Sequence, residues 1–389
     1  MANRKKIALC LEYPLALRGG VSVLVETLMA GLAGDYDLVL VSPDTVENLA
    51  NSPAKPFIHT HLPWNPATVS RRTSQDLARQ LAAAGVQLAH FHFGGNFGWG
   101  SRFIGHCPIP YAARLGIPTV STIHSFHGNL DGFCGPQKPF WFKLALFPFA
   151  WLGKMHVLSH LRREIAVSRT ICQKLRRLYW PFRGKFIQLY HSRLKPGGVA
   201  EKKPRENLIL NVGHIAAMKG QVFLAEAFAQ LAPRHPDWKL CLVGHVAEPA
   251  TAQEIVTIAR THNLADRILL PGESSEVHEL MRRARIYVQP SLSEALGLAL
   301  QEAMFYGACV IGTRTGGIPE LIQHAKTGLL VEPANVPQLT AALENLIAHP
   351  SLREDYGRAG AAAIPQMGMT AAQMSANHIR LYESILVHA

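Results

Sequence analysis

Short apolar runs alternate with longer amphipathic stretches along this chain of 389 residues. The first runs occupy residues 6–11, 37–42, 57–62 and 88–93, and turn-forming or polar residues separate them from the helical stretches. Runs of this length between stretches of helical periodicity predict parallel β-strands joined by crossover helices. The first part of the chain is therefore expected to form a doubly wound α/β sheet.

The same alternation begins again after a segment that predicts a linker. Residues 194–207 are rich in proline, glycine and charge, which is typical of a connection between domains. Behind them, NLILNV leads into a turn and a helix, and the run at 238–244 repeats this unit. Because 389 residues are long for one core, we expect two Rossmann-like domains, at 1–200 and 201–389.

The composition is that of a packed globular protein, with 48% hydrophobic and 17% charged residues. Six cysteines are scattered without a CxxC pair, which predicts free thiols in a reducing compartment. The apolar run behind the basic N-terminus is too short for a secretory signal, and no run is long enough for a transmembrane helix. We therefore expect a cytoplasmic protein, either free or peripheral on the inner face of the membrane.

Positive charge is concentrated in the first half of the chain. The net charge is +12 overall, +16 for residues 1–205 and −4 for residues 206–389. Residues 138–185 contain 11 basic residues and a single acid, Glu164. Such a patch attracts polyanions or an anionic membrane, and the simpler alternative is a solubilising surface.

The most apolar and aromatic segment lies within this basic region, at residues 139–154. Two prolines and lysine interrupt it, and it is shorter than the ~20 apolar residues that span a bilayer. Two interpretations remain open. It is either a buried helix of the N-terminal core or an interfacial segment on an anionic membrane, with the basic residues behind it near lipid phosphates.

The clearest chemical pattern is PSLSEALGLALQEAMFYGACVIGTRTGGIPE at 290–320. It places Glu294 in a predicted loop and Glu302, eight positions later, on a helix predicted for 298–306. Apolar runs precede and follow the pair of glutamates. Both ligand-facing turns are therefore expected at the carboxyl ends of strands, where open α/β sheets bind their ligands.

The start of the predicted helix is suited to an anion. Backbone N–H groups at Gly297, Leu298 and Ala299 would have no partner within the helix. One turn later, Glu302 is expected to accept hydrogen bonds from a vicinal diol such as ribose, while Glu294 reaches the other end of the ligand. The pattern predicts a sugar-nucleotide site, and the alternative is two solvated surface charges.

With two glutamates separated by seven residues, this segment resembles the signature of retaining glycosyltransferase family 4, glycosyl transferases group 1. The resemblance implies a GT-B fold, in which two Rossmann-like domains face an interdomain cleft. It also implies that a final helix, from about residue 371, crosses back onto the first domain. The implied activity is transfer of a sugar from a UDP- or GDP-sugar to a glycan or lipid-linked acceptor, without a metal or another cofactor.

The resemblance assigns further residues to the expected site. Gly19 and Gly20, after the first strand, would face the donor phosphates and the acceptor, and His124, after the strand in PTVSTIH, would line the reaction centre. In the second domain, Gly213 and Lys219 match the family pattern, and Lys219 would stabilise the leaving diphosphate. Glu294, Lys219 and His124 are thus the expected catalytic residues.

The chain departs from the family pattern at three places. His214 stands where the family usually has arginine, and a histidine is only partly protonated near neutrality. Ala295-Leu296 replaces the usual Gly-Phe, and YHSRL at 190–194 replaces an Asn-Gly turn before the linker. The first departure raises a second hypothesis, a nucleotide-sugar binder with weak catalysis.

Other functions are less consistent with the sequence. The basic half lacks a recognisable nucleic-acid module, so no nucleic acid partner is expected. Asp35-Tyr36-Asp37 resembles the metal-binding motif of GT-A enzymes but precedes a strand, and it is interpreted as a surface turn. Zinc is not expected either, because no Cys or carboxylate joins the alternating histidines at 59, 61, 90 and 92 at ligand spacing.

Overall fold

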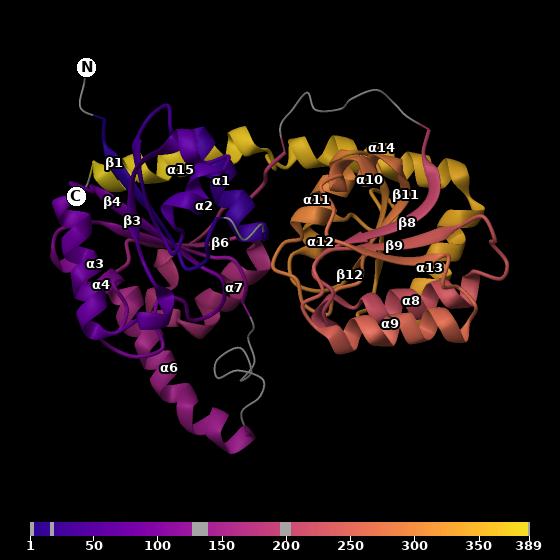
Figure 1. Ribbon diagram of the computed structural model, residues 1–389, viewed down its shortest axis with the longest axis horizontal. Coiled ribbons are helices and arrows are strands. Elements are labelled where there is room, and N and C mark those ends of the chain that lie inside the picture. The colour runs from indigo at the N-terminus through magenta and orange to yellow at the C-terminus, as the bar shows by residue number, and fades with distance from the viewer. Residues whose placement is uncertain (1–3, 16–18, 127–138, 195–203, 388–389) are drawn as a thin grey trace. The chain divides into compact units, whose positions relative to one another are not determined.

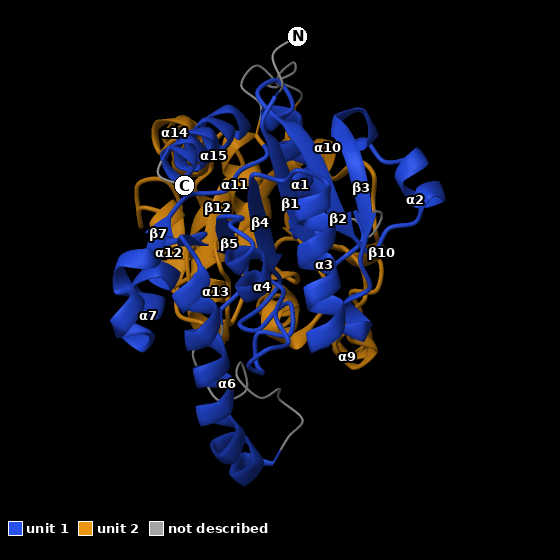
Figure 2. Cartoon of the chain, turned by 90° about the vertical axis from the view of Figure 1, so that its left-hand side faces the viewer, with its two compact units in different colours: residues 1–193, 371–389 blue, residues 194–370 orange. Residues whose placement is uncertain are grey.

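The computed structural model describes residues 4–15, 19–126, 139–194 and 204–387. The chain divides into two compact units, unit 1 with residues 1–193 and 371–389, and unit 2 with residues 194–370 (Figure 2). The expected boundary between residues 200 and 201 lies outside the described residues.

Unit 1 is built on a parallel sheet with strand order β3-β2-β1-β4-β5-β6-β7 among the described residues (Figure 1). Helices α1 and α15 lie on one face, and α3, α4 and α6 lie on the other. The strands are β1 (Lys6–Leu11), β2 (Asp37–Ser42), β3 (Ile58–Pro63), β4 (Leu88–Phe93), β5 (Thr119–Ile123), β6 (Arg163–Ala166) and β7 (Phe186–Gln188). The α-helices are α1 (Gly20–Leu32), α2 (Val46–Ala50), α3 (Arg71–Ala83), α4 (Ile109–Arg114), α6 (Phe140–His160), α7 (Arg169–Leu178) and α15 (Ala371–Leu386), with 3-10 turns η1 (Lys55–Phe57), η2 (Pro66–Thr68) and η3 (Trp180–Lys185).

Unit 2 repeats this architecture with strand order β10-β9-β8-β11-β12-β13. Helices α8, α9 and α13 cover one face, and α10, α11 and α14 cover the other (Figure 1). The strands are β8 (Glu206–Val212), β9 (Lys239–Val243), β10 (Ile268–Gly272), β11 (Ala284–Gln289), β12 (Cys309–Thr313) and β13 (Leu329–Val331). The helices are α8 (Gln221–Leu231), α9 (Pro249–Thr261), α10 (Val277–Arg283), α11 (Leu298–Phe305), α12 (Ile318–Leu321), α13 (Val336–Ala348) and α14 (Pro350–Gln366), with 3-10 turn η4 (Ala217–Lys219).

Both sheets confirm the predicted doubly wound α/β class. Every strand pair in the described residues is parallel, and the central strands are buried on both faces. Burial on both faces explains why these strands appear in the sequence as continuous apolar runs. Parallel strands also place their carboxyl ends at one edge of each sheet, where the predicted site residues follow them.

The final helix, α15, packs within unit 1 although it follows α14 of unit 2 in the chain. Gly31 of α1 admits it closely, because a Cβ at Gly31 would lie 1.9 Å from Ser375 Oγ. Tyr36 donates a hydrogen bond of 2.8 Å to Glu383, and Tyr382 Oη lies 2.6 Å from Nδ1 of His90 on β4. Side chains from two distant parts of the sequence thus complete this core.

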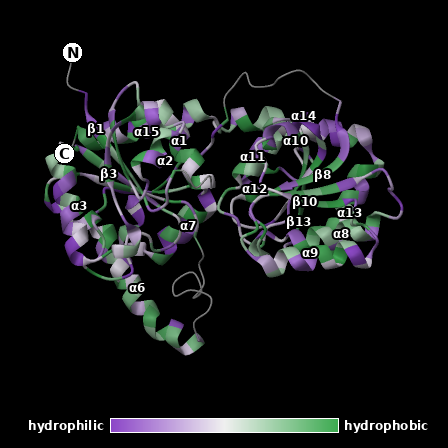
Figure 3. Ribbon diagram, viewed as in Figure 1, coloured by the Kyte–Doolittle hydropathy of each residue, from purple (hydrophilic) through white to green (hydrophobic). Residues whose placement is uncertain are grey.

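Helix α6 is buried at one end only. Its later part contributes Lys154, which is fully buried and lies 2.7 Å from the buried carboxylate of Glu164 on β6. Its earlier part projects away from the rest of unit 1 (Figures 1 and 2) and consists largely of hydrophobic residues, coloured green in Figure 3. There, Phe140 and Trp141 are both 70% exposed. The interpretation as a core helix is therefore right only for the later part of α6.

No helix in the described part of the chain combines the length and apolar character needed to span a bilayer.

Five histidines form a cluster in unit 1, four of them buried and His124 partly exposed. They come from β4, from the segments after β5 and β7, and from α15, and their neighbouring rings have centroids 4.2–5.7 Å apart. They are His90, His92, His124, His191 and His378. Burial lowers the pKa of each, that of His378 to about 4, so all five are neutral at pH 7.

This cluster predicts that unit 1 is acid-sensitive. Since each folded-state pKa is depressed, the unfolded chain binds more protons below about pH 6.5, and stability present above that pH is lost as the pH falls. Each histidine contributes up to about 1.4 kcal/mol per pH unit. Amide hydrogen exchange of β4 and α15 should therefore accelerate steeply between pH 7 and 5.5.

The control is His191→Leu. In the described residues, neither ring nitrogen of His191 has a hydrogen-bond partner, so this change should remove one titrating group and reduce the pH slope. Equal exchange protection at pH 7 and 5.5, after correction for intrinsic exchange rates, would contradict the prediction.

Candidate active site

The loop after β11 leads into helix α11, close to the bounds predicted from the sequence. Gly297 is the N-cap residue with φ +92°, a conformation that disfavours residues with a side chain. Leu298 and Ala299 form the first helical turn and are partly exposed. Their N–H groups belong to the set that has no acceptor within a helix, so this end of α11 is suited to an anionic ligand.

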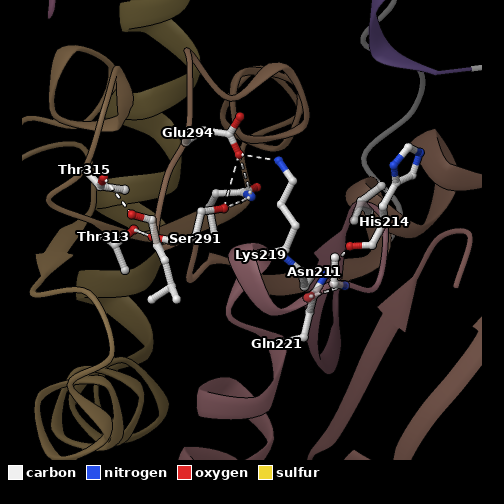
Figure 4. Close-up of polar contacts among 12 residues, drawn as sticks. Asn211, His214, Lys219, Gln221, Ser291, Glu294, Thr313 and Thr315 are labelled. Atoms are coloured by element: carbon white, nitrogen blue, oxygen red, sulfur yellow. Dashed lines mark hydrogen bonds and ion pairs between the residues drawn. The ribbon is translucent and has the colours of Figure 1, made fainter. Parts of the chain in front are cut away.

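An ion pair connects the loops after two neighbouring strands of unit 2. Lys219 follows β8 and Glu294 follows β11, and Lys219 Nζ lies 2.9 Å from Glu294 Oε2 (Figure 4). The Lys219 side chain is 31% exposed and that of Glu294 is 13% exposed. The structure thus brings two of the predicted catalytic residues into direct contact at the edge of the sheet.

The turn after β12 packs against the same loop. Gly316 has φ +53°, and a Cβ there would lie 1.5 Å from the carbonyl oxygen of Glu294. Gly317 N–H donates to that oxygen at 3.2 Å, and Thr313 and Thr315 donate to carbonyls of the β11 loop (Figure 4). Only glycine fits this approach, so the Gly316-Gly317 turn fixes the backbone position of Glu294.

Buried side-chain amides hydrogen-bond to the turn after β8 and fix its position. Gln221 is buried, and its Nε2 donates to the carbonyl of His214 at 2.8 Å and to Asn211 Oδ1 at 3.3 Å (Figure 4). Asn211 in turn donates to Val288 O of β11 at 2.8 Å. Gly213 has no atom within 4 Å of an ideal Cβ position, so this turn leaves room above it for another group.

His214 does not supply the charge of the arginine it replaces. Partial burial and the positive charge of Lys219 lower the pKa of His214 below its usual value of 6.5. The imidazole is therefore neutral at pH 7. In this turn, Lys219 carries the positive charge while His214 carries none.

Glu302 lies on the same helix as Gly297 but points toward α10. Its side chain is 1% exposed, and its Oε2 lies 3.8 Å from Nε2 of His278, a residue that is half exposed. The structure thus brings Glu302 together with His278, while Glu294 is joined to Lys219.

The remaining predicted site residues belong to unit 1. Gly19 is the N-cap residue of α1 and Gly20 is its first residue. His124 directly follows β5, and its Nε2 lies 3.0 Å from Nδ1 of His92. Burial, and then the neighbouring His92, lower the pKa of His124 well below 6.5, so this imidazole is neutral at pH 7. His127, three positions later in the sequence, lies outside the described residues.

Several polar residues that the sequence pattern did not single out support the site. Gln289 and Ser291 both donate to Glu294 Oε2, at 3.3 Å and 3.2 Å, and Asn211 and Gln221 hold the opposite turn. Their signal in the sequence is the presence of amide and hydroxyl residues at the ends of otherwise apolar strands. His278 had no such signal, because it lies on a helix distant in sequence from Glu302.

In the part of the chain that the structure describes, no group of three or more His, Cys, Asp or Glu side chains is arranged to hold a metal ion.

Two protein-family models match the chain over most of its length. Glycosyltransferase Family 4 matches residues 18–186, and Glycosyl transferases group 1 matches residues 198–363. The division between the two matched ranges falls close to the division between the two units.

Curated relatives match either one half or most of the chain. The lipopolysaccharide core biosynthesis mannosyltransferase LpcC of Rhizobium leguminosarum is 30% identical over 178 residues, which are 45% of this chain and 51% of LpcC. The alpha-maltose-1-phosphate synthase of Mycobacterium tuberculosis is 26% identical over 383 residues, 90% of this chain and 91% of the synthase. For several of the most similar relatives, the chain spans about half of their length or less.

Solved structures match along the entire chain. A glycosyltransferase from Rickettsia africae has a TM-score of 0.75 at 19% identity, with 100% of both chains covered. Anabaena HepE, solved in complex with UDP and glucose, has a TM-score of 0.73 at 14% identity, with 98% of this chain and 100% of HepE covered. At these identities, the structures establish the fold alone. The two family models show that the chain belongs to the family 4, group 1 glycosyltransferases, and the solved structures with the two parallel sheets show that it has the GT-B fold.

Proposed function

We propose that this protein is a retaining glycosyltransferase that transfers a sugar from a UDP- or GDP-sugar to a glycan or lipid-linked acceptor without a metal ion. The observation that carries this proposal is the pairing of Lys219 and Glu294 beside the start of α11. A cation and free helix N–H groups suit the diphosphate of a sugar donor, which is also its leaving group, and a carboxylate suits the sugar hydroxyls. The HepE structure with UDP and glucose supports a nucleotide sugar as the ligand.

The roles of the residues follow from their chemistry. Lys219 and the N–H groups of Leu298 and Ala299 bind the donor diphosphate, for which Gly213 leaves room. Glu294 accepts hydrogen bonds from the transferred sugar, and Glu302 accepts them from the ribose diol. In unit 1, the backbone at Gly19 and Gly20 faces the donor phosphates and the acceptor, and the neutral imidazole of His124 contacts the transferred sugar.

In the proposed reaction, the acceptor hydroxyl attacks the anomeric carbon from the face that the leaving group vacates. The bond between the anomeric carbon and the β-phosphate oxygen breaks, the acceptor oxygen forms the new bond, and its proton passes to the departing phosphate. Negative charge develops on the diphosphate, and Lys219 with the start of α11 stabilises it. No protein nucleophile takes part in this reaction.

The neutral state of His214 favours a second candidate, a nucleotide-sugar binder with weak catalysis. With one cation instead of two at the leaving group, stabilisation of the departing diphosphate is weaker. An assay of UDP- or GDP-sugar hydrolysis and transfer separates the candidates: release of nucleotide supports the enzyme, and binding without release supports the binder.

Membrane contact is part of the proposal, and it would make a lipid-linked acceptor accessible. The exposed early part of α6 presents Phe140, Trp141, Leu144 and Phe149, which are 58–70% exposed. Helix α6 also packs on η3, where Trp180 is 70% exposed, and the adjoining α7 and η3 expose Lys174, Arg176, Arg177 and Arg183. Exposed aromatic and basic side chains together suit the surface of an anionic cytoplasmic leaflet. The proposed location is therefore the cytoplasm, at the inner face of the membrane.

Removing the Glu302 carboxylate should weaken donor binding. Glu302→Ala is expected to reduce the affinity for the nucleotide by about 1.5–3 kcal/mol, the range for hydrogen bonds to a charged group. Isothermal titration calorimetry measures this loss. The control Glu344→Ala removes an exposed carboxylate of unit 2 that pairs with Arg234, and it should bind normally. Unchanged affinity in Glu302→Ala would refute its role.

Removing the Lys219 cation should reduce turnover more than it reduces binding. Negative charge on the diphosphate grows toward the transition state. Lys219→Ala should therefore reduce kcat about 10²-fold and reduce donor affinity by a smaller factor. Steady-state kinetics with and without EDTA test both parts of this prediction. Loss of activity with EDTA and its return with manganese would overturn the metal-free mechanism.

Replacing the aromatic residues at the start of α6 should reduce membrane binding. Wild type should sediment with anionic vesicles at low salt and be released at high salt, because screening weakens the electrostatic part. The triple variant Phe140/Trp141/Phe142→Ser should sediment less while keeping its thermal melting temperature. A wild type that does not bind anionic vesicles would show that the basic surface serves solubility or a soluble acceptor.

A further inference from the structure

The carboxylate of Glu294 is held through one of its two oxygens. Three donors converge on Oε2: Lys219 Nζ at 2.9 Å, Ser291 Oγ at 3.2 Å and Gln289 Nε2 at 3.3 Å. Among the described residues, Oε1 accepts no hydrogen bond, and Figure 4 shows the second oxygen directed away from these donors. One oxygen is therefore committed to the protein, and the other is left for a ligand.

The two neutral donors are themselves fixed in the core. Gln289 is 3% exposed and Ser291 is fully buried, and Gln289 Nε2 also donates to Ser291 Oγ at 2.8 Å. The buried hydroxyl of Tyr287 donates to Gln289 Oε1 at 2.8 Å. Because the amide oxygen of Gln289 is occupied by Tyr287, its NH2 group must face Ser291 and Glu294.

The third donor differs from these two. Lys219 has a flexible side chain that is 31% exposed, and its ammonium has three N–H donors. A diphosphate bound at the start of α11 carries more negative charge than one carboxylate, so it competes with Glu294 for this cation. The Glu294 carboxylate lies close enough to Lys219 to repel an anion that approaches the Lys219 ammonium.

We propose that the Lys219–Glu294 ion pair is a resting contact that the donor diphosphate replaces, and that Gln289 and Ser291 are positioning residues that hold Glu294 once Lys219 has turned to the ligand. This inference rests on the proposed function. Without the two neutral donors, the departure of Lys219 would leave the Glu294 carboxylate with no hydrogen bond from the described residues and free to rotate. With them, Oε1 stays directed toward the transferred sugar.

The first test measures UDP and GDP affinity by calorimetry at constant ionic strength. Glu294→Gln removes the competing charge and keeps the side-chain volume, so it should bind the nucleotide about two- to fivefold tighter, the range set by a partly exposed ion pair, although its turnover falls. The matched control is Glu332→Gln, which removes a carboxylate of the same unit that pairs with Arg314, and its affinity should be unchanged.

The second test separates positioning from binding. Ser291→Ala and Gln289→Leu should reduce kcat at least tenfold while the nucleotide Kd stays within a factor of two, and Tyr287→Phe should have a smaller effect in the same direction. Ser291→Thr keeps the hydroxyl donor and should retain most of the activity. Thermal melting of each variant identifies any loss of folding, and the changes at Ser291, Gln289 and Tyr287 test the positioning role independently.

The outcomes distinguish the inference from the proposed function. If the wild type binds neither UDP nor GDP, both are wrong. If the wild type binds one of them and Glu294→Gln binds it equally or more weakly, the resting contact is wrong. If the folded Ser291 and Gln289 variants keep full kcat, or lose binding and turnover in equal measure, these residues are not positioning residues.

Discussion

The contact between Gly316 and the backbone of Glu294 is the constraint on which the candidate site of unit 2 depends. Because Gly316 has no side chain, the backbones of the turns after β11 and β12 can come into direct contact. This approach fixes the loop that carries Glu294, and the loop ends at Gly297, where α11 begins. The carboxylate and the free N–H groups of the helix are therefore set by one backbone arrangement, to which Lys219 is added from the neighbouring β8.

The parallel sheet explains why residues far apart in the chain act together. Lys219 and Glu294 are 75 positions apart, but β8 and β11 are adjacent, so their carboxyl ends lie side by side. The buried amides of Asn211 and Gln221 brace one turn, and Gln289 braces the other. Such fully bonded networks keep a polar site rigid in an otherwise apolar sheet. Unit 1 has a different polar cluster, a group of neutral histidines that is completed by His378 of α15.

Much of this fold could be predicted from the sequence, because its causes are local. The strands at 6–11, 37–42 and 88–93 have the predicted bounds, since buried parallel strands are continuous apolar runs. Glu294 and Lys219 could be selected as single residues from their motif and their place after strands. Their ion pair could not be predicted, because it depends on strand order.

The histidines and α6 show the limit of sequence analysis most clearly. The alternating residues His90 and His92 gave no indication that His191 and His378 join them, since that contact requires α15 to return to unit 1. For α6, composition left a core helix and a surface helix equally open, because exposure depends on neighbours. Only the packed structure shows that Lys154 is buried while Trp141 is exposed.

In the proposed function, the strand ends of unit 2 bind the nucleotide diphosphate of a sugar donor. The most direct measurement is amide hydrogen exchange of the wild type during titration with UDP-, GDP- and ADP-sugars. We expect saturable protection of residues 213–220 and 291–300 by a UDP- or GDP-sugar. Absence of binding by all three donors, or protection confined to other parts of the chain, would contradict it.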